Sequence, residues 1–347
     1  MKRLLLGAAT LTAAAIALAG CASTGSSPTN TGSSPSIRGT SITVYNAQHE
    51  ELTQAWADAF SKESGVKVTL RNGDDSSLGN QIVQEGAASP ADVFLTENSP
   101  AMSLVDNAGQ FAKVDASTLS QVPDAYKPSS GTWTGIAARS TVIVYNPSKI
   151  SADQLPKSLL DLAKPEWKGR WAASPSGADF QAIVSALLAE KGKTVTLDWL
   201  KAMNVNSIAY KGNSTVMKAV NAGEVPLGVI YHYYWYIDQA GTKENSGNTK
   251  LALFQNQDPG TFVSISGGGV LKSSKNPAAA QAFLKFITGK AGQDILRTGT
   301  SFEYPVASDV APNPALPSLK SLDAPTIDPS KLNSKEVTDL MTQAGVI

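Results

Sequence analysis

The chain has 347 residues, and its 29 lysines and arginines balance 29 aspartates and glutamates, so the formal net charge is zero. This length exceeds one ordinary domain core and fits two lobes of moderate size. The balanced charge argues against a nucleic-acid-binding protein, which would carry a basic face.

The N-terminal segment is typical of a secretion signal. The chain opens with Met-Lys-Arg, and residues 4–19 are an apolar run rich in alanine and leucine. This run is too short, and ends too abruptly, to be a membrane-spanning helix. We therefore interpret residues 1–20 as a signal peptide. It closes with Leu18-Ala-Gly-Cys21, which resembles the lipobox of bacterial lipoproteins, where the signal is cut before a cysteine that is then acylated.

Cys21 is the only cysteine in the chain, so an intramolecular disulfide is excluded. A free cysteine is usually a buried structural thiol, but that role is implausible between a signal and a tail of small polar residues. Residues 21–40 contain almost no bulky apolar side chain and therefore predict a flexible tether. We expect an extracytoplasmic protein that a lipid on Cys21 anchors to the outer face of the cytoplasmic membrane.

From Ile42 onward one unit recurs, namely a short β-branched strand, a polar loop and an amphipathic helix. Strands are predicted over 42–45, 66–70, 92–95, 170–173 and 227–230. Helices are predicted over about 50–63, up to 104, over 180–191 and after the aromatic cluster at 231–236. This alternation predicts an α/β fold of parallel sheets with helices on both faces.

Two longer strand-like runs, 140–145 and 261–266, break this pattern. Neither leads through a short loop into a helix, so we predict that both cross between two lobes. The glycines at 267–269 suit a hinge, although glycine runs also occur in ordinary loops. A closing helix is predicted near 277–296.

Unusual polar residues occur in four predicted loops, each at the carboxyl end of a strand. The loops carry His49, Glu97, the segment 174–179 and the cluster 231–236. Because ligands of open α/β sheets bind outside the carboxyl ends of the strands, we expect these loops to converge. A lone histidine is more often structural than a ligand; we keep that interpretation for His232, whereas its position favours His49 as a ligand.

Tyr233 and Tyr234 are neighbours whose side chains can converge in a loop or in the first turn of a helix. Their cluster is equally compatible with core packing or with a stacking platform for an aromatic ligand. Phenols are poor ligands for Zn²⁺ and Ca²⁺. Together with His49 and Glu97, however, two phenolates form a mostly hard, anionic set that suits Fe³⁺, whose charge would lower a phenol pKa from its ordinary value of about 10.

Four protein donors leave two octahedral positions of the metal open. Ser176, Gly177 and Ala178 fall at a predicted helix N-terminus, where backbone N–H groups and the helix dipole attract anions. A phosphate or carbonate held there would complete the coordination of the metal. Taken alone, this segment is more simply interpreted as a capping loop.

These segments match a known family in its order, from about residue 41 to the C-terminus. The chain resembles the bacterial ferric-ion-binding proteins that feed ATP-driven iron importers, and the most specific part is Tyr-Tyr-Trp with an upstream Gln-His and Thr-Glu. The matching pieces are Thr43-Val-Tyr-Asn-Ala-Gln-His49, Pro90-Ala-Asp-Val-Phe-Leu-Thr-Glu97, Arg139-Ser-Thr-Val-Ile-Val-Tyr145, Pro165-Glu-Trp-Lys-Gly169, Ser176-Gly-Ala178, Gly223-Glu-Val-Pro226, Tyr233-Tyr-Trp235 and Gln257-Asp-Pro-Gly260.

The resemblance implies the two-lobed clamshell fold of type II periplasmic-binding proteins, with a mixed sheet flanked by helices in each lobe and hinge strands between them. Lobe 1 would comprise 41–138 plus 264–305, and lobe 2 would comprise 139–263 plus 306–347. Iron would bind the two tyrosines of lobe 2 before lobe 1 closes with its histidine and glutamate. The implied partners are an ABC permease and its ATPase subunit, and we expect a monomer.

By the same resemblance, Ser176, Gly177, Ala178 and Asn213 would hold the synergistic anion. The sequence departs from the family at Tyr231, where asparagine is common, at Thr141, where a second arginine is common, and at Asn98, where glutamine is frequent. Asn98, Arg139 and Tyr231 are therefore candidates for contacts around the metal donors, and the identity of the anion stays open. Arg139 either pairs with the anion or forms a structural ion pair at the hinge, which we favour slightly.

Two rival functions are compatible with these residues. A binding protein of the same fold could hold thiamine, a polyamine, sulfate or a phosphonate, since aromatic rings with Glu97 suit an organic cation. A phosphate-ester hydrolase could use His49 as base and Glu97 as acid. The sequence lacks a nucleophile elbow, a Walker loop and the paired histidines of a hydrolytic zinc site, so we predict that the protein is not an enzyme.

Overall fold

The computed structural model describes residues 36–254 and 256–347, so the predicted signal peptide, Cys21 and most of the predicted tether lie outside the described residues. The strands are β1 (Ser41–Asn46), β2 (Lys67–Asn72), β3 (Val93–Leu95), β4 (Thr134–Tyr145), β5 (Trp171–Ala173), β6 (Ser207–Ala209), β7 (Leu227–Tyr231), β8 (Lys250–Ala252) and β9 (Val263–Val270). The α-helices are α1 (Glu50–Ser64), α2 (Asp75–Glu85), α3 (Ser99–Asn107), α4 (Ala116–Leu119), α5 (Ala178–Asn206), α6 (Asn213–Ala222), α7 (His232–Ala240), α8 (Pro277–Thr288), α9 (Lys290–Thr298) and α10 (Ser334–Gln343).

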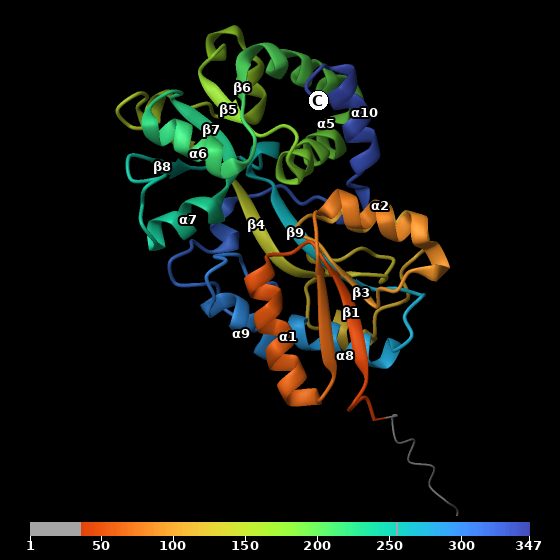
Figure 1. The fold of residues 1–347 in the computed structure, drawn as a ribbon. Coiled ribbons are helices and arrows are strands. Elements are labelled where there is room, and N and C mark those ends of the chain that lie inside the picture. Colours follow the sequence, from red (N-terminus) through yellow and green to blue (C-terminus); the bar gives the residue numbers. More distant parts are fainter. Residues whose placement is uncertain (1–35, 255) are drawn as a thin grey trace, which may run out of the picture. The chain divides into compact units, whose positions relative to one another are not determined.

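The strands of residues 37–347 form a sheet in the order β2-β1-β3-β9-β4-β7-β5-β6, and β8 pairs with β4. β1 pairs in parallel with β2 and β3, and β5 pairs in parallel with β6 and β7. We call β2-β1-β3 the first strand group and β7-β5-β6 the second strand group. The long strands β4 and β9, side by side in Figure 1, are antiparallel to each other and to the strands they meet at each group.

The predicted parallel pairing is found within each strand group, and the two runs expected to break that pattern, β4 and β9, pair antiparallel with their neighbours. Both strands hold central places in the sheet, and the expectation that they cross between two lobes stays a prediction. The mixed sheet is the arrangement that the family resemblance implied.

Helices pack on both faces of the first strand group, as the alternation of its side chains requires. Val44 and Val93 face a cluster that contains residues of α1 and α8. Their neighbours Tyr45 and Phe94 face the opposite cluster, which contains residues of α2 and α3.

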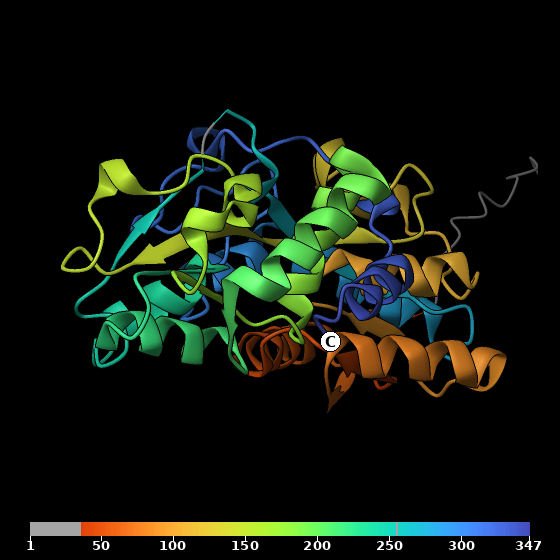
Figure 2. The same cartoon turned by 90° about the horizontal axis from the view of Figure 1, so that it is seen from above.

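The second strand group has the same three-layer arrangement. Trp171 joins a cluster with α5 and α10, whereas the adjacent Ala172 joins a cluster with α6. Figure 2 shows these helices from above. Each strand group thus carries its own hydrophobic clusters, and β4 and β9 connect the two.

The glycines at 267–269 lie inside β9, so they do not form a loop, and their suitability for a hinge stays a prediction. A Cβ at Gly267 would lie 2.2 Å from Met102 Cγ, and one at Gly269 would lie 2.6 Å from Phe111 Cε1. Glycine is required here because neighbouring side chains approach the strand closely. The glycines thus allow β9 to pack closely against these side chains in the core.

Glycines interrupt two of the helical segments. α5 (Ala178–Asn206) consists of two helices across a kink at Gly192, where φ is 79°, so its first part ends where the helix predicted over 180–191 ends. The closing helix predicted near 277–296 is interrupted at Gly289 and forms α8 and α9. Glycine breaks helical runs easily because it loses the most conformational freedom on ordering.

Candidate functional site

The four predicted loops meet at the carboxyl ends of strands from both groups. His49 occupies the N-cap position of α1 after β1, without a capping hydrogen bond from its side chain, and Glu97 follows β3. Asp179 lies in the first turn of α5 after β5, and Tyr233 lies in the first turn of α7 after β7. Each side chain is positioned where a strand has ended and a helix begins, which is the place that open α/β sheets offer to ligands.

The side chains of these loops contact one another. His49 Nδ1 lies 3.4 Å from Glu97 Oε1, and the His49 ring centroid lies 4.9 Å from that of Tyr233. The rings of Tyr233 and Tyr234 stack with their centroids 4.3 Å apart. The structure therefore brings the four predicted metal donors into one contact network.

Asp179 is the centre of this network. Its Oδ2 accepts hydrogen bonds from Tyr233 Oη at 3.3 Å and from Tyr234 Oη at 3.1 Å. Asn213 Nδ2 donates to the same oxygen at 2.7 Å, and Asn98 Nδ2 donates to Oδ1 at 3.0 Å. Asp179 belongs to the third predicted loop, where the sequence assigns it no role; its signal was a carboxylate in the first helical turn after a strand.

Asn98 links residues of both strand groups. Its Nδ2 also donates to Asp75 Oδ2 at 3.1 Å, and its Oδ1 accepts from Tyr231 Oη at 3.3 Å and from Ser264 Oγ at 2.9 Å. Asp75 accepts from the Glu97 backbone N–H at 2.9 Å. Asn98 and Tyr231, both expected near the donors, thus belong to one hydrogen-bond network with Asp179.

Arg139 of β4 lies fully buried next to this network and forms an ion pair with Glu303, which is also fully buried. Its Nη2 donates to Ser266 Oγ, and its Cζ lies 5.8 Å from the ring centroid of Tyr233. Of the two roles considered for Arg139, this contact corresponds to the structural ion pair. Glu303 was not anticipated, because no strand or helix pattern surrounds it.

The electrostatics of the site favour a cation. Burial raises the pKa of Glu97 well above its usual range, and the charge of Asp179 adds to that effect. Burial also raises the pKa of Asp75 to about 7. The pKa values of Tyr233 and Tyr234 are raised by burial and then by the charges of Asp179 and Glu97. A bound cation would reverse these effects, since its charge stabilises carboxylate and phenolate.

The two histidines have contrasting surroundings. His232 is fully buried; its Nδ1 accepts from the Ser140 N–H at 3.2 Å, and its Nε2 is 2.8 Å from the Phe302 carbonyl oxygen. Burial lowers the pKa of His232 to about 4. These contacts agree with the structural role predicted for it.

The His49 Nε2 is buried without a hydrogen-bond partner. Burial lowers the pKa of His49, although the charge of Glu303 opposes this. A neutral imidazole with an unengaged nitrogen is the form in which histidine binds metals.

Within residues 36–254 and 256–347, no three His, Cys, Asp or Glu side chains lie together as a metal site. A metal at the converging loops must therefore use tyrosine oxygens as well. Tyrosine oxygens suit a hard cation of high charge better than they suit Zn²⁺ or Ca²⁺.

The predicted anion loop lines a cavity of about 770 Å³ beside the site. Ser176, Gly177 and Ala178 share this cavity with Asp75 and Asn98. Asn213, the fourth predicted anion contact, instead directs its amide nitrogen at Asp179.

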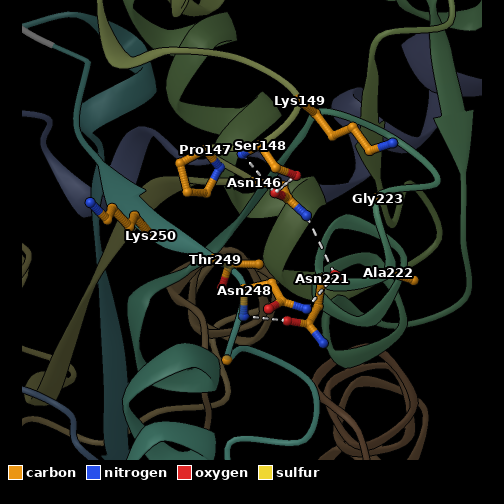
Figure 3. A pocket seen from close by; sticks show the side chains of 11 residues that line it. Asn146, Pro147, Ser148, Lys149, Asn221, Ala222, Gly223, Asn248, Thr249 and Lys250 are labelled. Atoms are coloured by element: carbon orange, nitrogen blue, oxygen red, sulfur yellow. Dashed lines mark hydrogen bonds between the residues drawn. The ribbon is translucent and has the colours of Figure 1, made fainter.

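A second pocket, of about 440 Å³, lies where β4 ends near α6 and β8 (Figure 3). Its amides are engaged with protein groups: Asn146 Nδ2 donates to the Val220 carbonyl oxygen, and the Asn248 N–H donates to Asn221 Oδ1. Lys149 and Lys250 complete its polar lining. This pocket contains none of His49, Glu97, Tyr233 and Tyr234. The site at the carboxyl ends of the strands is therefore the better functional candidate.

Two strand groups joined by long crossing strands, with polar loops of both groups meeting at one site, define a solute-binding protein of the type II periplasmic class. A family model described as "Bacterial extracellular solute-binding protein" matches residues 88–331, and the chain belongs to this family. In the part of the chain that the structure describes, no helix has the length and apolar character needed to cross a membrane.

Individual relatives agree with this assignment. The chain is 69% identical over 306 residues to the Fe(3+)-binding periplasmic protein of Serratia marcescens, covering 88% of this chain and 90% of that one. It is 37% identical to the major ferric iron-binding protein of Neisseria meningitidis serogroup B, covering 88% and 93%. The structure of iron-bound HitA from Pseudomonas aeruginosa matches with a TM-score of 0.82 and 40% identity, covering 88% of this chain and 99% of that chain.

Proposed function

We propose that the protein captures ferric iron outside the cytoplasmic membrane and delivers it to an ABC-type importer. The observation that carries this proposal is the convergence of one imidazole, one carboxyl group and two phenols, the phenols being hydrogen-bonded to Asp179. The relatives named as ferric iron-binding proteins support the same cargo.

We infer that His49, Glu97, Tyr233 and Tyr234 bind the metal. Deprotonation of both phenols and of Glu97 would supply three negative charges, which neutralise Fe³⁺. The pKa values that burial raises would fall as the metal replaces the protons. Release of protons on binding is therefore part of the proposed reaction.

Asp179 is proposed as a further anionic group of the same site. Its carboxylate already accepts hydrogen bonds from both phenols, so it lies at the point where their oxygens meet. It would either bind the metal directly or hold the two phenols in place until the metal replaces their protons. Phosphate or carbonate on Ser176, Gly177, Ala178 and Asn213 would then occupy the remaining coordination.

Capture is proposed to involve closure of two lobes with the bounds 41–138 plus 264–305 and 139–263 plus 306–347. β4 and β9 would flex between them, and Asn98 would connect the closed lobes, because it contacts Asp75, Asp179 and Tyr231. The protein would act as a monomer that passes iron to a permease and its ATPase.

The proposal is tested by titrating the purified, iron-free protein with Fe³⁺ in the presence of phosphate or carbonate. A strong visible phenolate-to-iron absorption is expected at one iron per chain, and Tyr233→Phe should weaken it. Tyr236→Phe is the matched control, since this half-buried tyrosine of α7 lies outside the donor set. A colourless titration together with tight binding of thiamine or a polyamine would overturn the proposal.

Attachment through Cys21 is tested separately from iron binding. Cys21→Ser should release the protein from the membrane fraction of cells that express it. Persistence in that fraction would contradict the proposed lipid anchor and leave the iron proposal intact.

A further inference from the structure

The edge of the first strand group where β1, β2 and β3 begin is opposite to the edge that carries the proposed metal site. Ser41 of β1 pairs with Lys67 of β2, and β9 ends beside the start of β3. Asn276, which follows β9, donates its Nδ2–H to the Ser41 carbonyl oxygen at 2.9 Å. Figure 1 shows the ribbon entering β1 at this edge, at the bottom of the view. Four segments therefore meet here, namely 36–41, 61–67, 89–93 and 271–276.

These four segments carry an excess of positive charge. Their acidic residues are Glu63 and Asp92, and Asp92 is buried, with its carboxylate accepting from the Thr43 and Lys275 N–H groups. Within residues 36–254 and 256–347, none of their cations forms an ion pair. We call these five exposed cations the basic edge: Arg38, Lys62, Lys67, Lys272 and Lys275.

Local stability does not explain the basic edge. Lys62 lies in the last turn of α1, where a cation stabilises the helix dipole. Arg38 instead lies over the C-cap glycine of α1, since a Cβ on Gly65 would be 3.0 Å from Arg38 Cγ. The other three cations stand at a strand start or in the turn after β9. Only one of the five thus has a stabilising role in a helix.

The opposite edge of the same strand group has the opposite charge. The segments 47–51, 73–77 and 96–99, which follow β1, β2 and β3, contain no lysine or arginine. They contain five acidic residues, which are Glu50, Glu51, Asp74, Asp75 and Glu97. The first strand group is therefore polarised along its strands, and a negatively charged surface attracts one edge and repels the other.

The chain enters its compact unit, residues 37–347, at the basic edge. The predicted tether that precedes Ile37 starts at Cys21, and a glycine- and serine-rich chain of that length has a root-mean-square reach of about 20–24 Å. The acidic edge lies farther along by the length of β1, about 20 Å. An acyl chain on Cys21 would therefore keep the basic edge, rather than the acidic edge, near the membrane.

We propose that the basic edge docks on the head groups of anionic phospholipids in the membrane to which Cys21 attaches the chain. The docked protein presents the edge with His49 and Glu97 to the solution, which is the orientation that suits capture of cargo. The contacts are exposed and electrostatic, so they release readily when the protein turns to a permease. The inference rests on the proposed lipid anchor for its location and is independent of the identity of the cargo.

The test is sedimentation of the unacylated mature chain with vesicles of phosphatidylglycerol and phosphatidylethanolamine. This chain begins at Ala22 and contains the whole compact unit. Binding is expected at about 0.1 M salt and should be lost at about 1 M salt, where the Debye length has fallen from about 10 Å to about 3 Å. Vesicles of phosphatidylcholine, which carry no net charge, should bind little protein at either salt concentration.

The variant Lys62→Gln/Lys67→Gln/Lys275→Gln should lower the partition coefficient by about 100-fold, at about fivefold for each cation. The matched control is Lys193→Gln/Lys201→Gln/Lys218→Gln, which removes three exposed charges from α5 and α6 and should bind nearly as the wild type does. Both variants should bind Fe³⁺ as the wild type does, which verifies that they are folded.

The orientation is measured on the acylated wild type by labelling its lysines with an amine-reactive reagent and locating the labels by mass spectrometry. Lys62, Lys67 and Lys275 should react several-fold more slowly on phosphatidylglycerol vesicles than on phosphatidylcholine vesicles. Lys193 and Lys201 should react equally on both.

Equal binding to both kinds of vesicle, equal losses in the two triple variants, or equal labelling rates would overturn the inference. Because sedimentation uses the unacylated chain, a Cys21 that proves not to be acylated overturns the proposed anchor alone. An acylated chain whose basic edge shows no preference for phosphatidylglycerol overturns the docking alone.

Discussion

The site has a phenol side, formed by Tyr233, Tyr234 and Asp179, and an imidazole side, formed by His49 and Glu97. The two sides differ in how many of their polar atoms have a hydrogen-bond partner within the protein. On the phenol side, Asp179 accepts from Tyr233, Tyr234, Asn98 and Asn213. On the imidazole side, His49 and Glu97 are 24% and 23% exposed, and His49 Nε2 has no hydrogen-bond partner. The hydrogen bonds of the phenol side are thus formed before iron binds, whereas the imidazole side lacks part of its hydrogen bonding until iron binds.

This difference agrees with the proposed order in which iron meets the tyrosines first and the histidine and glutamate afterwards. A preorganised set of donors lowers the cost of ordering on binding.

Removing one phenol should damage iron binding more than removing the imidazole. Tyr233→Phe or Tyr234→Phe deletes a charged donor of the organised side, and the affinity for Fe³⁺ should fall by more than about 100-fold, since even partners of metal ligands are worth 10–100-fold. His49→Asn should lower the affinity for Fe³⁺ by a smaller factor. Competition titration against a chelator measures all three, and a larger loss in His49→Asn would reverse the contrast.

Asp179→Asn tests whether the carboxylate that organises the phenols contributes to binding. The affinity for Fe³⁺ in anion-free buffer should fall by about 10–100-fold, and phosphate should restore part of it. Asp198→Asn, an exposed position on the same helix, is the control and should bind normally. A rise in affinity would mean that Asp179 only competes with the metal for the phenols.

Asn98→Ala should weaken the connection between the two sides without removing a metal donor. Asp75, Asp179 and Tyr231 would each lose a buried partner, so the free energy of unfolding of the iron-free protein should fall by about 2 kcal/mol. Urea denaturation measures this change. Asn80→Ala, which removes an exposed hydrogen bond on α2, should change it little, and equal effects in both variants would contradict the role of Asn98.

Asp74→Ala should have the smallest effect and leave iron binding unchanged. Asp74 caps α2 by accepting from the Ser77 N–H at 2.8 Å, so its loss should cost about 1 kcal/mol of stability. Partial burial alone would raise the pKa of Asp74, but the hydrogen bonds of Ser77 lower it. The stabilisation is therefore present above the unfolded-state pKa of about 3.9 and is lost as the pH falls through the folded-state pKa. Urea denaturation of both proteins at pH 7 and pH 3 measures it, and an equal difference at the two pH values would contradict the capping role.

Local sequence patterns were sufficient to predict the polar loops that follow the ends of the strands. His49, Glu97 and Tyr233 each stand directly after a β-branched run and before a helical pattern, so the positions of these residues at one sheet edge follow from the α/β alternation. The first turn of α7 was also foreseeable as a place where adjacent phenols converge. The family resemblance added the mixed sheet, which alternation alone did not predict.

The tertiary structure alone revealed the role of Asp179, the partner of Arg139 and the position of the glycines 267–269. Asp179 becomes the centre of the phenol side because β5 and β7 lie next to each other in the sheet. Glu303 meets Arg139 because the backbone of residues 302–304 is fixed against β4 and His232. The sequence by itself determined which residue types stand at the ends of strands, since strand and helix periods are local. Only the tertiary structure decided which of them share a buried hydrogen bond, since that depends on the order of the strands in the sheet.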